Sequence, residues 1–215
     1  MTSRERILAE IRRRQGRGGP ISPTERERIE TYLRRHPRGP LRKPAADPVA
    51  AFRERAQASA STTDRVAALA GAPAAVAKYL EAHQLPRVGC VWPQLAGLDW
   101  RGAGLMLEAR AANGEDPIGV TGVFSAIAET GTLMLCSGAD TPATVSLLPE
   151  THVALVPIGR IVPFMEDAWD LARAELGRLP RAVNFISGPS RTADIEQTIV
   201  LGAHGPYRVH IILVG

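Results

Sequence analysis

Cysteine is scarce in this chain: of its 215 residues, only Cys90 and Cys136 carry thiols. The two lie far apart and each borders an apolar run, which is typical of reduced, partly buried thiols rather than of a disulfide framework. No CxxC pair or cysteine cluster occurs, so the sequence lacks the usual ligand set for an iron–sulfur cluster or a structural zinc ion. We therefore expect this chain to bind no cofactor and no metal.

Long apolar runs and the common catalytic motifs are also missing. No segment has the length and hydropathy of a signal peptide or a membrane span, which predicts a cytoplasmic protein without membrane association. The motifs GxGxxG, GxxxxGK[ST], GxSxG and HExxH do not occur, so dinucleotide-binding, nucleotide-binding, esterase and metalloprotease functions lack their signatures. No motif in the sequence indicates an independent redox enzyme.

Lysine is rare as well, and the positive charge is unevenly distributed. The chain has two lysines, and its formal net charge is +4. Residues 1–43 carry thirteen Lys or Arg against five Glu, so the basic character belongs to this N-terminal arm. A basic arm can bind nucleic acid or an acidic partner. The arm lacks interleaved aromatic residues. Nearly all positive residues of the whole chain are Arg rather than Lys, which indicates a compositional bias, so we do not expect nucleic-acid binding.

Helix patterns and prolines divide the chain into two parts. Residues 2–14 and 24–35 have the apolar spacing and capping residues of short helices. The prolines of residues 36–48 mark a linker. We therefore predict a basic helical extension and linker over 1–48 and an α/β domain over 49–215.

In the second part, helical patterns alternate with short apolar runs that are typical of buried strands. The expected helices cover 49–61, 74–83 and 163–176. The expected strands cover 87–92, 131–136, 152–156, 182–186 and 209–214. This alternation predicts an α/β fold with an open, mostly parallel sheet flanked by helices on both faces.

The first of three segments rich in Gly, Thr and Ser spans residues 119–132 and contains GVTG and ETGT. We predict a glycine-rich loop that enters a short helix, followed by a turn before the next strand. The N–H groups and Thr hydroxyls of such loops suit anionic oxygens, although isolated turns of this kind are commonly structural. Glu129 is either a helix-end charge or a functional acid, base or nucleophile.

The second segment, residues 186–196, follows an apolar strand, and open α/β sheets bind ligands at the carboxyl ends of their strands. Ser190 and Thr192 would either cap a following helix or belong to a ligand-binding loop. Arg191 would hold a carboxylate or phosphate, or pair with Asp194 or Glu196. The sequence leaves these interpretations open.

The third segment is Gly-Ala-His-Gly-Pro at residues 202–206. Its His204 is expected in a loop, where it can titrate or donate to a ligand, although a lone histidine is more often structural. His152 and His210 lie in strand patterns without metal-ligand spacing, so we assign them no role.

In this order and spacing, the three segments resemble the LUD-domain family of lactate utilisation proteins, also called the LutC or YkgG family. The stretches that carry the resemblance are GVTG with AIAETGTLML, SLLPETHVALVP with RIVPFMEDA, and FISGPSRTADIEQTIVLGAHGPYRVHIILV. The resemblance covers roughly residues 85–215 and implies a fold similar to the NagB/RpiA/CoA-transferase group. This chain departs from the family pattern at Val123, Phe124 and Ala203.

The resemblance also transfers a predicted site to this chain. Our hypothesis is that Glu129 and His204 are its catalytic residues and that one of them handles a proton. The predicted ligand-binding positions are Thr121, Gly122, Thr130, Gly131, Thr132, Gly188, Ser190, Arg191, Thr192, Asp194, Glu196 and Gly205. We expect the three segments to meet at the carboxyl ends of the strands.

The first hypothesis for function is an accessory subunit of an iron–sulfur system that oxidises L-lactate to pyruvate. The family resemblance implies two partner subunits that carry the iron–sulfur clusters, while this chain would bind a small carboxylate such as lactate or pyruvate. The alternative is a stand-alone enzyme, CoA-transferase-like or sugar-phosphate-isomerase-like, that uses Glu129 as nucleophile or base. A third hypothesis is a regulatory or nucleic-acid-binding protein that acts through its basic arm.

Overall fold

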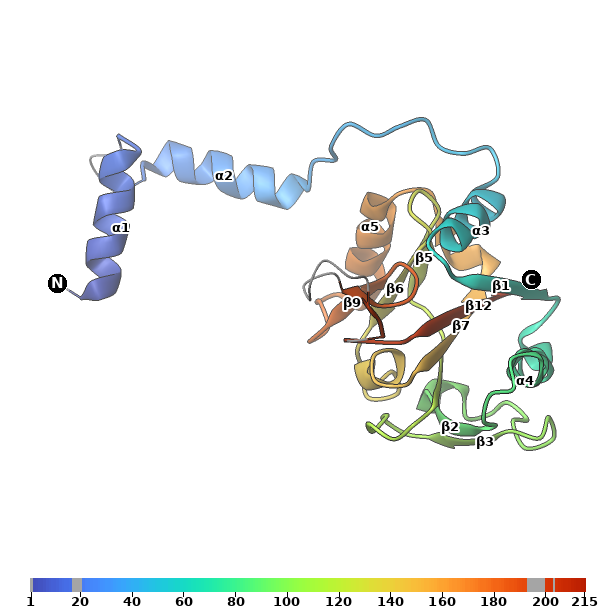
Figure 1. Ribbon diagram of the computed structural model, residues 1–215. Helices are drawn as coiled ribbons and strands as arrows, with labels where there is room; N and C mark the ends of the chain where they lie inside the picture. Colours follow the sequence, from blue (N-terminus) through green and yellow to red (C-terminus); the bar gives the residue numbers. More distant parts are fainter. Residues whose placement is uncertain (1, 17–20, 193–199, 203) are drawn as a thin grey trace. The chain divides into compact units, whose positions relative to one another are not determined.

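The computed structural model describes residues 2–16, 21–192, 200–202 and 204–215 (Figure 1). The chain forms two compact units, Met1–Leu41 and Arg42–Gly215. The domain boundary expected between residues 48 and 49 stays a prediction.

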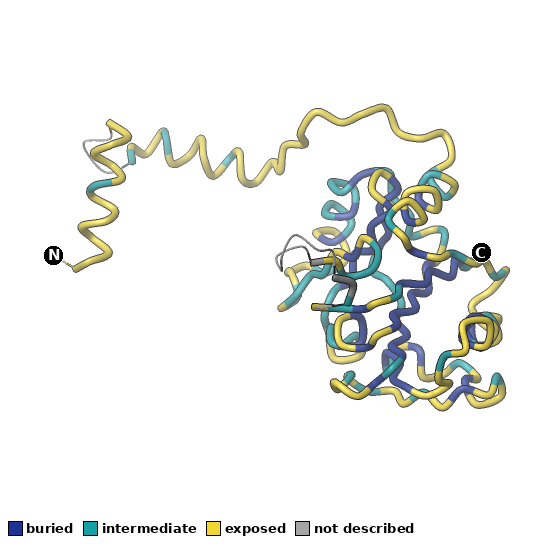
Figure 2. Tube along the Cα trace, viewed as in Figure 1, coloured by how far each residue is buried: buried dark blue, intermediate teal, exposed yellow. Residues whose placement is uncertain are grey.

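The described part of the first unit contains two amphipathic helices. Helix α1 (Ser3–Arg14) begins with a capping box at Thr2, and α2 (Pro23–Arg35) begins at the N-cap Ser22. Both helices predicted for this arm are confirmed. Neither contains a buried residue, and Figure 2 shows them exposed along almost their whole length.

A six-stranded sheet forms the centre of the second unit. Its strands, in spatial order, are β1 (Thr62–Val66), β12 (Arg208–Val214), β7 (Thr151–Pro157), β4 (Ile118–Thr121), β2 (Val88–Val91) and β3 (Met106–Ala109). Every neighbouring pair is parallel. The apolar runs of the central strands are buried, as parallel sheets with covered faces require. The predicted open, mostly parallel sheet is confirmed.

Three α-helices accompany this sheet among the described residues of the second unit. They are α3 (Pro48–Ala58), α4 (Ala72–Ala82) and α5 (Met165–Leu176), and short 3₁₀ turns cover Leu69–Gly71, Pro93–Leu95, Ala143–Ser146 and Ile158–Arg160. Figure 1 shows α3 and α4 on opposite sides of β1. Helix α3 begins at Asp47, whose carboxylate accepts two backbone N–H groups, and it buries Phe52 and Ala56. None of the described helices is long and apolar enough to cross a membrane.

A separate four-stranded sheet was not anticipated from the sequence. Its strands, in spatial order, are β8 (Ile161–Val162), β5 (Ser125–Ile127), β6 (Thr132–Cys136) and β9 (Val183–Ile186). Strand β6 is antiparallel to both β5 and β9. The short helix predicted after GVTG is wrong, because this stretch is β5. The connection from β5 to β6 is too short for a parallel crossover, so the chain turns back as a hairpin.

The second predicted segment also differs from expectation. Arg191–Thr192 forms β10, which pairs antiparallel with β11 (Val200–Leu201). A helix beginning directly after Ser190 is therefore wrong, because Arg191–Thr192 pairs as a strand. A helix capped by Thr192 would fall on residues 193–199, which lie outside the described residues. Asp194 and Glu196 lie outside the described residues.

Two histidines are buried within the six-stranded sheet. His152 is fully buried, and the side chain of His210 stacks on Tyr79 with ring centroids 3.8 Å apart. Thr62 Oγ1 lies 2.8 Å from His210 Nδ1. Burial lowers the pKa of His152 to about 3 and that of His210 to about 4, so both imidazoles are neutral at pH 7.

These histidines make the stability dependent on pH. Their folded-state pKa values lie below the ordinary value of about 6.5, so the unfolded chain binds more protons in acid. The stabilisation from these neutral, buried histidines is expected to be fully present above about pH 7. On lowering the pH to 5, the free energy of unfolding should fall by about 2 kcal/mol per histidine. Urea unfolding between pH 5 and 7 measures this slope. The double variant His152→Gln/His210→Gln should flatten this slope, whereas replacing the exposed His36 in His36→Gln should not. Equal slopes in the native chain and both variants would contradict the role of the two buried histidines.

Candidate functional site

Two glycines let loops touch the backbone at the C-terminal end of α3. Gly131 lies in the turn between β5 and β6 with φ of +66°, and a Cβ there would be 2.3 Å from the Ala56 nitrogen. Gly188 follows β9 with φ of +82°, and its Cβ would be 2.0 Å from the carbonyl oxygen of Ser59. Any other residue would clash at either position, so the first and second segments both require glycine for packing on α3.

A chain of three hydroxyls joins the same two segments. Thr130 Oγ1 lies 2.7 Å from Thr132 Oγ1, which lies 2.6 Å from Ser187 Oγ. Thr130 is exposed and Thr132 is buried, so the chain leads from the surface into the domain. Because a hydroxyl can donate and accept at once, Thr130 can offer a donor to an anionic oxygen while Thr132 and Ser187 fix its position.

The third segment joins the second through backbone contacts. The Ser190 N–H donates to the Pro206 carbonyl at 2.9 Å, and the Gly202 N–H donates to the Ser190 carbonyl at 2.9 Å. A Cβ on Gly205 would approach the Ser190 side chain at 3.3 Å. His204 is exposed beside these contacts. The structure therefore brings the second and third segments together.

Arg191 lies at the same end of α3. Its Nη2 donates to the carbonyl oxygen of Ser59 at 3.3 Å, and its side chain is exposed. The guanidinium thus retains donors that can reach a carboxylate from solvent.

Thr121 and Gly122 have different neighbours. The Thr121 side chain is fully buried, and its Oγ1 lies 2.8 Å from His152 Nε2. Gly122 faces Trp92, because a Cβ there would be 3.6 Å from the indole ring. Thr121 therefore supports the sheet from inside, whereas Gly122 adjoins an aromatic wall.

The strand register separates these two residues from the third segment. Thr121 ends β4 and pairs with Ala154, toward the carboxyl ends of the parallel strands. Residues 204–206 of the third segment lead instead into the amino end of β12, where Arg208 pairs with Thr151. The expectation that all three segments meet at the carboxyl ends is therefore wrong. Gly131, Gly188 and Arg191 instead contact the end of α3, and the third segment joins the second at Ser190. The loop cluster is the set of loops that carry these residues and His204.

Glu129 borders a cavity of about 140 Å³ in the second unit. Its side chain is exposed, and its backbone N–H donates to the Pro163 carbonyl at 3.0 Å. The cationic residues that line the cavity are Arg42, Lys43 and Arg55, and the apolar ones are Ala45, Pro48, Ala51, Ala128, Pro163 and Phe164. Positive side chains around a small, mostly apolar space suit a small organic anion.

The sequence did not identify the three cations of this cavity. Arg55 lies in α3, far from Glu129 along the chain, and only the packing of the turn between β5 and β6 on α3 brings them to one cavity. Arg42 and Lys43 fall in the segment predicted as linker. A helical arginine and two basic linker residues have no local pattern that distinguishes them from solvated surface charges.

The two thiols lie in different sheets. Cys90 in β2 is fully buried, and burial raises its pKa to about 12. Cys136 ends β6, and burial raises its pKa as well. Among the described residues, no group of three His, Cys, Asp or Glu side chains is placed to hold a metal ion.

The family model of the LUD domain matches residues 96–214, more than half of the chain. The chain belongs to this family.

Its similar proteins include several named Lactate utilization protein C. The one from Bacillus subtilis (strain 168) is 38% identical over 131 residues, covering 57% of this chain and 53% of the relative. The one from Halalkalibacterium halodurans is 44% identical over 100 residues, covering 45% of this chain and 44% of the relative. The chain spans about half the length of the curated relatives it matches.

A solved structure also matches the fold. The crystal structure of a DUF162 family protein from Deinococcus radiodurans at 1.70 Å resolution is 27% identical, with a TM-score of 0.58. The match covers 82% of this chain and 100% of that one.

Replacing Gly131 tests the contact between the turn and α3. Gly131→Ala is expected to lower the free energy of unfolding by about 2–4 kcal/mol, through left-handed backbone strain and overlap with Ala56. Gly159→Ala is the matched control, since nothing lies within 4 Å of its added Cβ, and it should change stability by less than about 0.5 kcal/mol. Urea unfolding followed by circular dichroism measures both, and equal effects would disprove the required close approach.

Proposed function

We propose that this chain acts in lactate utilisation as an accessory, non-redox subunit of an iron–sulfur system that oxidises L-lactate to pyruvate. Its LUD domain and its 38–44% identity to proteins named Lactate utilization protein C support the role in lactate utilisation. With two cysteines in different sheets, the chain does not offer the four thiolates of a typical cluster, so the clusters would belong to partner subunits. We expect this assembly in the cytoplasm.

The cavity bordered by Glu129 is the observation that carries the choice of ligand. Its volume of about 140 Å³ suits a molecule of a few heavy atoms, such as lactate or pyruvate, better than a nucleotide. Arg42, Lys43 and Arg55 can hold the carboxylate, and the alanine and proline side chains suit a methyl group. Oxidation of lactate to pyruvate breaks the hydroxyl O–H bond and the Cα–H bond. Glu129 would accept the hydroxyl proton, and the Cα hydrogen would leave with its electron pair to an oxidising centre of the partner subunits. His204 and Arg191 would assist from the loop cluster.

The exposed Glu129 carboxylate also supports a second candidate, the stand-alone CoA-transferase-like or sugar-phosphate-isomerase-like enzyme. A carboxylate beside a small cationic cavity can act as nucleophile or base toward an anionic substrate. Turnover of acyl-CoA by the purified chain alone, with an acyl adduct trapped on Glu129, would favour this candidate over the accessory subunit.

Anaerobic reconstitution tests the accessory role. Lactate-dependent dye reduction by the partner iron–sulfur proteins is expected to require this chain. Glu129→Gln removes the proton acceptor, and Arg55→Ala removes a charge-assisted hydrogen bond that contributes about 1.5–3 kcal/mol, so each is expected to lower the rate about 10-fold or more. Arg53→Ala, also on α3 but not lining this cavity, should leave the rate unchanged.

The two parts of the proposal fail separately. Full dye reduction without this chain would reject the accessory role. A requirement for the chain, combined with full activity of the Glu129→Gln and Arg55→Ala variants, would reject the cavity as the carboxylate site. Arg191→Ala tests the loop cluster in the same assay.

A further inference from the structure

A larger cavity, of about 390 Å³, lies beyond the ends of β2 and β4. Its lining residues are Trp92, Gln94, Val123, Phe124, Cys136, Ser137, Gly138, Thr141, Arg160, Leu176, Arg178, Leu179 and Pro180. Trp92 directly follows β2, and Val123 and Phe124 follow β4. None of the described residues lines both this cavity and the one at Glu129.

This cavity lies where the connections between strands of the six-stranded sheet reverse direction. Along the chain, β2 is followed by β3, which lies beside it at the edge of the sheet. The next strand of this sheet after β4 is β7, which lies on the side of β4 opposite to β2. Since β2 and β4 are neighbours, the direction of the connections reverses between them. Open α/β sheets bind ligands in the crevice outside the carboxyl ends of the strands at such a reversal.

The charged groups of this cavity are of one sign. Of the described lining residues, Arg160 and Arg178 are basic and none is acidic. Arg160 is engaged, because it donates to both carboxylate oxygens of Glu175 at 2.8 Å and to the Phe124 carbonyl at 2.8 Å. Arg178 is exposed and pairs with no carboxylate within the part of the chain that the structure describes. Its guanidinium is therefore available to an anion.

The remaining wall is largely apolar and includes an aromatic ring. Phe124 is half-buried and packs beside α5, and the Arg160 guanidinium lies 4.9 Å from its ring centroid. Leu179 is 58% exposed next to Arg178, so an apolar side chain and a cation share the cavity rim. An aromatic group gains contact area and ring–ring attraction from such a wall.

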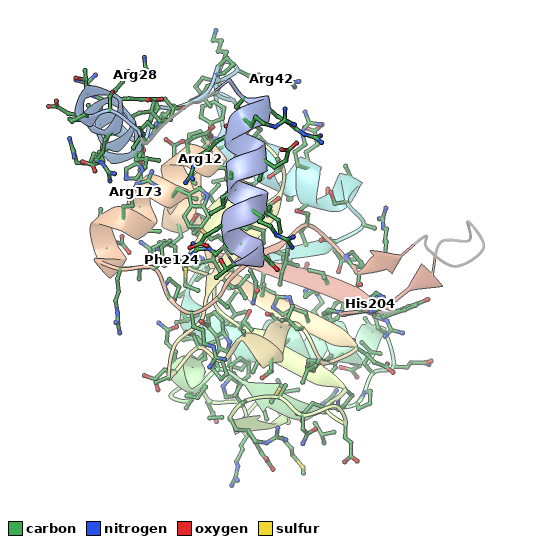
Figure 3. The ribbon with its side chains drawn as sticks, turned by 90° about the vertical axis from the view of Figure 1, so that its left-hand side faces the viewer. Arg12, Arg28, Arg42, Phe124, Arg173 and His204 are labelled. Carbon is green, nitrogen blue, oxygen red and sulfur yellow. The ribbon has the colours of Figure 1, made fainter. Side chains whose placement is uncertain are left out.

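We propose that this cavity binds an aromatic organic anion, with its ring against Phe124 and Leu179 and its anionic group on Arg178. A volume of about 390 Å³ falls in the range of about 300–1,000 Å³ typical of sites for larger organic ligands. The proposal does not depend on the role in lactate utilisation. Figure 3 shows Phe124 and His204 on opposite sides of the domain, so this site is distinct from the loop cluster.

Protection of Cys136 reports whether the cavity is occupied. Cys136 lines it, whereas Cys90, the other thiol of the chain, is fully buried. Alkylation of the full chain by iodoacetamide at pH 8.5, located by mass spectrometry, is measured with AMP and with 1-naphthoate as probes. At least one probe is expected to slow alkylation of Cys136 in a saturable manner. If AMP protects Cys136 at a lower concentration than 1-naphthoate does, the anionic group of the ligand is a phosphate. If 1-naphthoate protects at the lower concentration, it is a carboxylate.

Neutral analogues and one arginine pair test the anionic contact. Adenosine and 1-naphthalenemethanol are expected to need about 10-fold higher concentrations than the matching anions, because they lack the charge-assisted hydrogen bond. Arg178→Ala should remove this difference, whereas Arg181→Ala, which does not line the cavity, should preserve it. Circular dichroism confirms that both variants are folded.

Two results would overturn the proposal. The first is the absence of saturable protection of Cys136 by either probe in the native chain. The second is protection that the neutral analogues or Arg178→Ala leave unchanged, because the cavity would then bind apolar molecules without recognising an anion.

Discussion

The close approach of two glycine-containing loops to the backbone of α3 determines the candidate site. Gly131 and Gly188 have no Cβ, so the turn between β5 and β6 and the loop after β9 both reach the end of this helix. This contact places Arg55 and Glu129 at one cavity and the hydroxyls of Thr130, Thr132 and Ser187 in one chain. Glycine is therefore needed here for packing first, and any ligand contact depends on that packing.

Much of the fold could be predicted from the sequence, because strands within a domain show as short apolar runs bounded by turn residues. Five such runs correspond to β2, β6, β7, β9 and β12. Sheet membership could not be predicted, since β6 and β9 resemble the other strands in composition but pair antiparallel in the second sheet. The stretch after GVTG was misassigned as a helix for a related reason: three residues show too little periodicity to distinguish β5 from a helical turn.

The site was only partly accessible from sequence. Motifs identified Glu129, Gly131 and Arg191, because each lies in a short Gly-, Ser- or Thr-rich stretch of consecutive residues. They did not reveal that Thr121 is enclosed with His152, since burial depends on strands distant along the chain. The cations around Glu129 were missed for the same reason. Cavities formed by distant segments have no local signature, whereas loops formed by consecutive residues do.

The position of β12 has a consequence for how the chain folds. This strand, far along the sequence, lies between β1 and β7, so β1 has no neighbour in the sheet until residues 208–214 have been synthesised. During synthesis on the ribosome, β1 and its flanking helices would emerge before the rest of the domain. The backbone N–H and C=O groups of β1 would stay unpaired until most of the domain has emerged. Such a high contact order implies slow folding and a period of vulnerability to aggregation, when chaperone binding would matter most.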